Sequence, residues 1–234
     1  MKIGILADIH GNQYALEEVL LSARKEKIEK LLVLGDIVGY YYHPEKVLEK
    51  LNDWDFDFIK GNHENILIKL ISKEITASAI RSKYGSGHQK AIEQLSNHQI
   101  EFLIHAPENQ KLEIQGSSIL ICHVTPWQSD FYLYPDSPKE ILDKCDIPDI
   151  DFVFTGHSHH AFVHFGKESL LVGVGSVGQN RSIGGVASWA ILNTANGTIQ
   201  LKSTPYDVSP LLYEIQRHDP DIEYLKDILV RNRI

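Results

Sequence analysis

The sequence predicts an α/β fold, and two features of its apolar pattern support this. In the first half of the chain, short apolar runs alternate with amphipathic helical patterns, which is typical of a mainly parallel sheet. In the second half, the apolar runs follow one another more closely, so this half should be richer in strands, some of them antiparallel. A chain of 234 residues can bury one substantial core, and we therefore expect a single domain over residues 1–234.

The elements of the first half begin with a strand at residues 2–7 and a helix after it. Asn12 is placed to cap this helix, because its side chain can accept a backbone N–H of the first turn. Further strands are expected at residues 31–34 and 56–59, and Pro44 suits the first turn of the helix between them. At about residues 65–105, apolar positions recur every three or four residues, which predicts a helical insertion beside the sheet.

The second half contains a series of short apolar runs that we interpret as strands. They span residues 118–122, 152–155, 161–165, 170–174, 188–192 and 199–202. Two amphipathic helices are expected to close the chain, the first carrying Leu211 and Ile215 and the second carrying Leu225 and Ile228.

Composition excludes several classes of protein. No apolar run approaches the roughly 18 residues of a membrane-spanning helix. The net charge is −8, with 31 acidic and 23 basic residues and no basic block, which argues against long nucleic acid as a partner. Two cysteines make no disulfide framework, so we expect a cytoplasmic protein. The sequence leaves a homo-oligomer open.

Polar residues follow five of the expected strands at the point where each strand ends. They are Asp8 and His10, Asp36, Asn62 and His63, His123, and His157 and His159. Ligands bind at the carboxyl ends of the strands in an open α/β sheet, because loops there can present side chains without breaking the ladder. Any one of these residues alone would more often be a cap or a surface group. Together, in order, they predict one site.

The residue types indicate a metal centre. Carboxylates, imidazoles and a carboxamide suit manganese, iron, zinc or nickel, whereas calcium prefers oxygen alone and structural zinc more often recruits cysteine. A carboxylate such as Asp36 can bridge two ions with its two oxygens. Two ions roughly 3.5–4 Å apart can clamp the attacking and leaving oxygens of a phosphate ester.

In this order and spacing, the motifs resemble the five-block signature of the calcineurin-like metallophosphoesterases. The blocks are Asp8-Ile9-His10, Gly35-Asp36, Gly61-Asn62-His63-Glu64, His123 and Gly156-His157-Ser158-His159. The resemblance runs from about Lys2 to Ile191, and residues 7–12 and 35–40 are most similar to the small bacterial and archaeal phosphodiesterase-like branch. It implies two mixed β-sheets packed as a sandwich with flanking helices.

The resemblance also implies a role for each residue. Asp8, His10 and His159 would hold one divalent ion, and Asn62, His123 and His157 would hold the other. Asp36 would bridge the two ions, and His63 would lie beside the bound phosphate as a catalytic residue. The implied activity is hydrolysis of a small phosphodiester or phosphomonoester by hydroxide formed on the two metals, with manganese as the first choice and iron, zinc or nickel as alternatives.

Some features depart from the family pattern or leave alternatives open. Val124 follows His123 where glycine is common, and residues 173–176 replace a more usual Asn-Pro-Gly-Ser, but neither change removes a ligand. Residues 39–41 lack the Asp and Arg of the protein phosphatase branch, which argues against a phosphoprotein phosphatase. The alternative function is a non-catalytic protein-binding scaffold, as in the retromer subunit that resembles this family.

Other residues carry weaker expectations. Asn12, Tyr40 and Arg181 are candidate substrate contacts. The aromatic residues of segments 40–42 and 127–134 either wall a pocket for an aromatic leaving group or a nucleobase, or pack loops onto the sheet. Five further histidines are expected at the surface or at caps: His88, His98, His105, His164 and His218. His160 should face away from the site, and Cys122 should be buried opposite His123.

Overall fold

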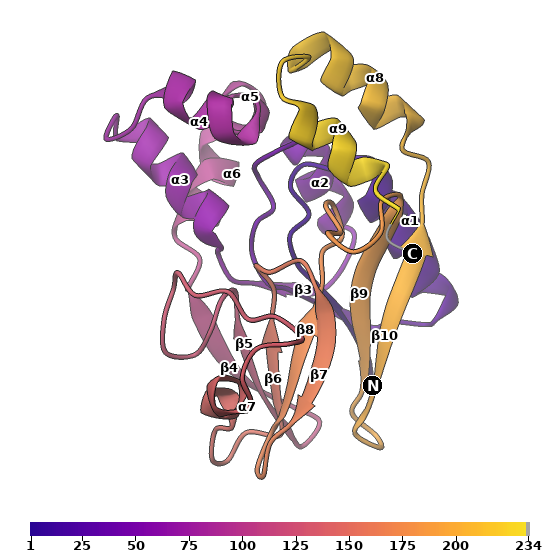
Figure 1. The fold of residues 1–234 in the computed structure, drawn as a ribbon. Coiled ribbons are helices and arrows are strands. Elements are labelled where there is room, and N and C mark those ends of the chain that lie inside the picture. Colours follow the sequence, from indigo (N-terminus) through magenta and orange to yellow (C-terminus); the bar gives the residue numbers. More distant parts are fainter. Residues whose placement is uncertain (233–234) are drawn as a thin grey trace.

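The computed structural model, which describes residues 1–232, contains two five-stranded mixed sheets packed against each other (Figure 1). The first sheet has the order β10-β9-β1-β2-β3. Its strands are β1 (Lys2–Leu6), β2 (Lys30–Val33), β3 (Phe56–Phe58), β9 (Val186–Asn193) and β10 (Thr198–Pro205). The strands β1, β2 and β3 are parallel, and the hairpin of β9 and β10 joins them antiparallel to β1.

The second sheet has the order β4-β5-β6-β8-β7. Its strands are β4 (Asn109–Ile114), β5 (Ser117–Cys122), β6 (Phe152–Thr155), β7 (Ala161–Phe165) and β8 (Leu170–Val174). The three central strands β5, β6 and β8 are parallel, and the two edge strands are antiparallel to their neighbours. The mixed sandwich that the motif resemblance implied is therefore confirmed.

The main core lies between the two sheets. Ile3, Ile5 and Leu32 of the first sheet meet Ile121 and Phe154 of the second in one buried cluster. These side chains alternate along their strands, because successive residues of a strand point to opposite faces of its sheet. The alternate residues form the outer clusters, in which Leu6, Leu31 and Val33 pack under the helices.

Helices cover the outer side of the first sheet and one end of the sandwich. They are α1 (Gln13–Lys25), α2 (Pro44–Leu51), α3 (Asn62–Ile71), α4 (Ala77–Tyr84), α5 (Gly87–Gln94), α6 (Asn97–Ile104), α8 (Ser209–His218) and α9 (Glu223–Leu229). In Figure 1 the helices α3–α6 and α8–α9 sit above the ends of the sheets, with α1 and α2 behind them. None of the described helices is long and apolar enough to cross a membrane.

The helical segment expected at about residues 65–105 consists of the four helices α3–α6, with bounds of 62–104. Strand β4 was not expected, because its sequence is mainly polar and its exposed edge position places little of it in the core. The short α7 (Lys139–Leu142) and the 3₁₀ turn η1 (Asp143–Cys145) were also missed. They cover the outer side of the second sheet, where the buried Cys122 packs with Leu142 and Cys145.

Core packing between the sheets gives a first testable prediction. Phe154 is fully buried, so Phe154→Ala should lower the free energy of unfolding by roughly 3–5 kcal/mol through lost burial and a residual cavity. Phe165→Ala, at a side chain that is 79% exposed, is the matched control and should change it by less than about 0.5 kcal/mol. Urea unfolding monitored by tryptophan fluorescence measures both. Equal effects of the two substitutions would contradict the placement of the core.

Candidate metal centre

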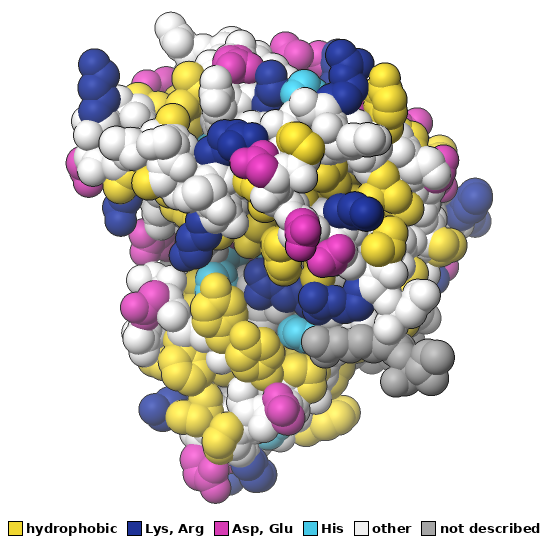
Figure 2. Space-filling model, turned by 45° about the horizontal axis from the view of Figure 1, so that its top comes forward, with side chains coloured by type: hydrophobic (Ala, Val, Ile, Leu, Met, Phe, Trp, Pro, Cys, Tyr) yellow, Lys and Arg dark blue, Asp and Glu magenta, His cyan; other side chains and the backbone are white. Residues whose placement is uncertain are grey.

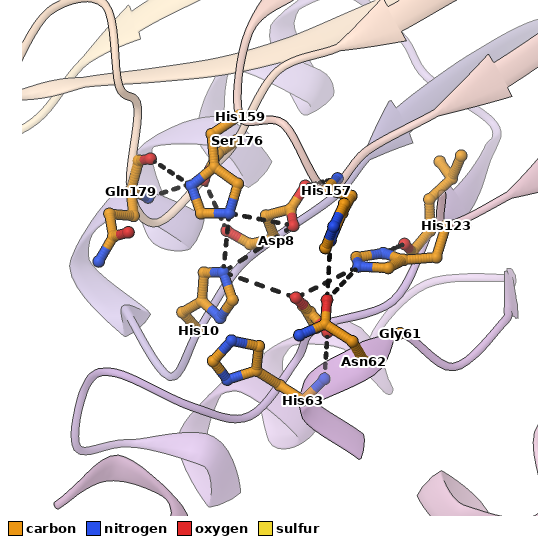
Figure 3. Close-up of polar contacts among 12 residues, drawn as sticks. Asp8, His10, Gly61, Asn62, His63, His123, His157, His159, Ser176 and Gln179 are labelled. Atoms are coloured by element: carbon orange, nitrogen blue, oxygen red, sulfur yellow. Dashed lines mark hydrogen bonds and ion pairs between the residues drawn. The ribbon is translucent and has the colours of Figure 1, made fainter. Parts of the chain in front are cut away.

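The seven residues expected to bind metal come together at the seam between the two sheets (Figure 3). Asp8 follows β1, Asp36 follows β2, and Asn62 begins α3 directly after β3. His123 follows β5, and His157 and His159 follow β6. The first sheet thus contributes the carboxylates, His10 and the carboxamide, and the second sheet contributes the other three imidazoles.

The backbone turns sharply at these strand ends. Six of the ten non-glycine residues with positive φ in the described chain lie here: Asp8, His10, Asp36, Tyr40, His157 and His159, with φ between 36° and 63°. A left-handed conformation costs a non-glycine residue energy, and such residues cluster at functional sites because the surrounding structure must hold them. The strained turns point several polar side chains from adjacent positions into one space.

The first group of candidate ligands is formed by Asp8, His10 and His159. The two imidazole Nε2 atoms of His10 and His159 lie 3.2 Å apart, and Asp8 Oδ1 lies 3.3 Å from His159 Nε2. The Nδ1 atoms of these rings face the backbone carbonyls of Val38 and Gln179 at 3.1 and 2.7 Å. A carbonyl can only accept, so both Nδ1 atoms carry the hydrogen, and both Nε2 atoms present a lone pair.

Charge in this first group favours a cation between the ligands. Burial lowers the pKa of His10 to about 3 and the pKa of His159 well below its ordinary value, so both rings are neutral near pH 7. Two lone pairs and a carboxylate oxygen then face one another, and Asp8 Oδ1 is buried without a hydrogen-bond donor. Neutral imidazole and carboxylate are the states in which these side chains bind metal. The residues present therefore fit a divalent ion.

The second group is formed by Asn62, His123 and His157. Asn62 Oδ1 lies 3.0 Å from His123 Nε2 and 2.8 Å from His157 Nδ1, while His123 Nδ1 donates to the Leu34 carbonyl at 2.6 Å. Burial disfavours the charged form of His123, but the neighbouring Asp36 and Asp8 outweigh it and raise the pKa of His123 to about 10. That proton occupies the place of a cation, and it must leave when a metal binds.

Asp36 lies between the two groups. Its Oδ2 is 3.3 Å from His123 Nε2 and 3.8 Å from His10 Nε2, and its Oδ1 accepts the backbone N–H of His63 at 2.8 Å. Burial opposes ionisation of Asp36, but the surrounding imidazoles, His123 first, keep its pKa well below the ordinary value. One carboxylate oxygen therefore faces both groups, as a bridging ligand would.

Glu64 fixes the loops that carry these ligands. Its fully buried carboxylate accepts four backbone N–H groups, from Asp36, Ile37, Val38 and Gly61, at 2.7–3.2 Å. Burial and the nearby Asp36 raise the pKa of Glu64 to about 7, against the effect of the N–H donors. Glycine is also required at position 61, before the ligand Asn62, because a Cβ there would overlap with Asp36 Oδ1.

His63 is buried in a stack of rings beside the candidate ligands. Its ring centroid lies 4.7 Å from that of His10, and 4.9 Å from those of Tyr40 and Tyr84. Its Nδ1 is buried without a partner, and burial lowers the pKa of His63 well below its ordinary value. One ring nitrogen of His63 also lies within 4.8 Å of Asp36 and His10 ligand atoms, so the ring can reach any group bound there.

The expectation that His88 is a surface or cap residue is wrong. His88 is 1% exposed, and its ring stacks on that of His63 with centroids 5.0 Å apart and planes 12° apart. Helix α5 carries it under the site, where close packing of the backbone at Gly39 and Gly87 leaves no room for a Cβ. A lone histidine in a polar helix gives no sign of such burial, because the sign lies in tertiary packing.

The three candidate substrate contacts have different surroundings. Asn12 caps α1 as expected, but it is fully buried, and its amide donates to the Gly178 carbonyl and the Tyr206 hydroxyl. All of its side-chain polar atoms are engaged within the protein, so the structure gives it a structural role. Tyr40 and Arg181, in contrast, line a small cavity with Asp36 and His63 at the metal centre.

The aromatic residues divide between the two roles that the sequence left open. Tyr41 and Tyr42 are buried against α8 and α9, where they pack loops as part of the core. Tyr132 lies over His157 with ring centroids 4.1 Å apart, at the edge of the site. Trp127 lines a second hollow of about 250 Å³ that also borders Asn62 and His123. Tyr84, which the sequence analysis did not single out, joins the small cavity from the end of α4.

Comparison with known proteins agrees with this geometry. Residues 1–197 match the family model described as the calcineurin-like phosphoesterase superfamily domain. The chain is 29% identical over 237 residues to the uncharacterized protein MJ0912 of Methanocaldococcus jannaschii, with 92% of each sequence covered.

Two solved structures share the fold over 98% of each chain. One is the hypothetical protein PH1004 from Pyrococcus horikoshii OT3, with a TM-score of 0.85 and 20% identity. The other is a metallophosphoesterase from Sphaerobacter thermophilus, with a TM-score of 0.76 and 22% identity. Together with the match to the family model, they confirm the resemblance inferred from the motifs, and this chain belongs to the calcineurin-like phosphoesterase family.

Proposed function

We propose that this protein is a two-metal phosphoesterase that hydrolyses a phosphodiester or phosphomonoester of a small molecule. The observation that carries the proposal is the group of inward-facing acceptors formed by Asp8, His10 and His159, which one oxygen of Asp36 joins to the second group at His123. Such an arrangement of lone pairs and negative charge is unfavourable alone and favourable around two cations. All seven expected ligand positions are filled, which favours the enzyme over a non-catalytic scaffold.

In this proposal Asp8, His10 and His159 hold one ion, Asn62, His123 and His157 hold the other, and Asp36 bridges them. Manganese is the first choice of metal, with iron, zinc or nickel as alternatives, because the ligand set mixes nitrogen and oxygen. When bound, the two ions would activate the attacking water and neutralise charge on the phosphate.

The protein's own residues would bind and orient the ester. His63, at the edge of the ligands, would donate a hydrogen bond to the phosphate from its neutral ring. It would donate a proton to the leaving oxygen where the negative charge of the bound ester raises its lowered pKa. Arg181 and Tyr40, which line the same cavity, would also contact the phosphate. Gly39 allows the His63 ring its position, because a Cβ there would lie 2.1 Å from His63 Nδ1.

Local charge supports a small anionic substrate. The whole chain has a net charge of −8, yet Figure 2 shows Lys and Arg side chains gathered in the middle of one face, next to an exposed histidine. Two cationic side chains lie near residues of the cavity: the Lys83 ammonium is 4.9 Å from the Tyr84 ring centroid, and Arg231 donates to the Arg181 carbonyl. Such a confined patch suits a small phosphate ester rather than a long polyanion.

Removal of metal should lower stability. Ions that bind only the folded chain stabilise it by mass action, so saturating chelator should lower the melting temperature by roughly 5–10 °C relative to protein at about 100 times the metal Kd. Differential scanning calorimetry with and without manganese measures the shift. Asp36→Asn protein should show little of it. If neither manganese nor chelator changed the melting temperature of the wild type, an occupied metal centre would be excluded.

Loss of the bridging carboxylate should abolish hydrolysis. Asp36→Asn removes the charge that faces both groups, so we expect lower metal content and no turnover of nitrophenyl phosphate esters. Asp53→Asn, at an exposed position, is the control and should match the wild type. Elemental analysis together with a panel of mono-, di- and cyclic phosphate esters measures both properties. Negligible metal in wild-type protein purified without chelator, with no ester cleaved, would favour the scaffold.

Replacement of His63 separates catalysis from metal binding. His63→Asn should keep metal content nearly intact and lower turnover by roughly 10²- to 10⁴-fold, the usual effect of losing a positioned acid or base. The loss should be larger for alkyl esters than for nitrophenyl esters, because a good leaving group needs little protonation. The exposed His98→Asn serves as the control. Loss of metal in step with activity would instead make His63 a ligand.

A further inference from the structure

The entrance to the metal centre is lined by three tyrosines and one arginine. Tyr40, Tyr84, Tyr132 and Arg181, here called the mouth, surround a cavity of about 20 Å³ whose floor is formed by Asp36, Asn62, His63, His157 and His159. A cavity of this size holds about one water molecule by the same measure. Any substrate must therefore present a small group to the centre.

The mouth residues come from separate segments that converge over the site. Tyr40 follows β2, Tyr84 ends α4 in the helical segment, Tyr132 lies between β5 and α7, and Arg181 lies between β8 and β9. Tyr224 of α9 lies next to Tyr40, with the two ring centroids 6.2 Å apart. Helix α9 lies beyond residue 197, where the match to the family model ends. The surroundings of the mouth thus include residues beyond the match to the family model.

Arg181 is held in place without a carboxylate partner. Its backbone carbonyl accepts Arg231 Nη1 at 3.1 Å, and the preceding Asn180 bonds Ser188 and the backbone of Ser182. Its Nε is buried without a hydrogen-bond partner, while its guanidinium interacts with the Tyr224 hydroxyl. No carboxylate of the described residues forms an ion pair with Arg181. The phenol does not neutralise the guanidinium, so its positive charge is available to an anion.

Two tyrosines of the mouth, Tyr40 and Tyr132, differ in how tightly they are packed. Tyr40 is 5% exposed and is packed against His10, with ring centroids 4.6 Å apart, and against Tyr84, at 5.5 Å. Tyr132 is 43% exposed and contacts the floor through His157. Entry of a phosphate should therefore displace Tyr132 more easily than Tyr40, because fewer contacts hold the exposed ring.

We propose that the mouth selects phosphomonoesters, with Arg181 binding a terminal phosphate oxygen that in a diester would carry the second substituent. The proposal rests on the hydrolase function proposed above and specifies its substrate class. A monoester carries a charge near −2 at neutral pH and has three unsubstituted oxygens, so it can satisfy both the metal centre and Arg181. A diester has one negative charge less and a second bulky group, which the cavity between the mouth residues has no space to hold and which would have to lie in the separate hollow beside Trp127. Hydrolysis would use one water, break one P–O bond and release an alcohol and inorganic phosphate.

Two esters with the same leaving group test this selection. The wild type, loaded with manganese, should show a higher kcat/KM for p-nitrophenyl phosphate than for bis(p-nitrophenyl) phosphate. Arg181→Met should lower kcat/KM for the monoester by roughly 10- to 100-fold, the effect of losing a charge-assisted hydrogen bond, and should change the value for the diester by much less. The exposed Arg217→Met on α8 is the matched control and should leave both values unchanged. Preference for the diester, or equal losses on both esters, would overturn the proposal.

Substitution of Tyr132 tests whether limited space excludes diesters. Tyr132→Ala should widen the cavity and raise the ratio of diester to monoester turnover, while Tyr132→Phe keeps the ring and should keep the ratio. If the ratio of diester to monoester turnover did not rise in Tyr132→Ala, the idea that diesters are excluded by lack of space would be contradicted.

A binding experiment separates this proposal from the proposed hydrolase function. Calorimetry on wild-type protein, with and without manganese, should give tighter binding of inorganic phosphate than of dimethyl phosphate, and Arg181→Met should remove most of the difference. If neither nitrophenyl ester were cleaved, the hydrolase proposal would fail, and the phosphate titration would still decide whether the mouth binds a terminal phosphate. Equal affinity of the wild type for the two anions would overturn the selection.

Discussion

The structure depends on one electrostatic constraint: carboxylates and neutral imidazoles are buried together with their lone pairs facing inward. Asp8 and Asp36 are almost completely buried, and His10 and His159 bring two bare nitrogens within 3.2 Å of each other. Burial of such groups without compensation is expensive, since an unpaired charge in the interior costs several kcal/mol. Cations, or protons in their place as at His123, relieve the constraint. The surrounding fold holds these side chains together despite the free-energy cost of burying them.

The backbone, more than the side chains, sets the geometry. The imidazoles of His10, His123 and His159 are each oriented by a backbone carbonyl that fixes which nitrogen faces the centre. Left-handed turns direct several of the ligands inward, and Glu64 accepts three backbone N–H groups of the loop after β2 and the N–H of Gly61 before α3. This explains why glycine at position 61 and the acidic residue at position 64 belong to the same short motif.

The sequence predicted the parts of the fold and site that follow from local pattern. Nine strands were expected near their observed bounds, because apolar runs that end in polar loops identify them, and the ligand residues were recognised because each follows a strand. Strand β4 was missed because an edge strand needs few apolar residues. Three features depend on contacts between segments far apart in the chain, and no local pattern encodes them. They are the burial of His88, the position of Tyr84 at the cavity and the hydrogen bonds of Asn12.

The division of ligands between the two sheets has a consequence for how the molecule assembles. Asp8, His10, Asp36 and Asn62 belong to the first 62 residues, whereas His123, His157 and His159 come after β5. In the proposed ligand sets each ion takes ligands from both halves, so neither half can build a complete coordination sphere while it is being synthesised. High-affinity binding of the proposed ions would then occur late, after the two sheets have packed together, and the ions would act as cross-links between the two halves of the sandwich.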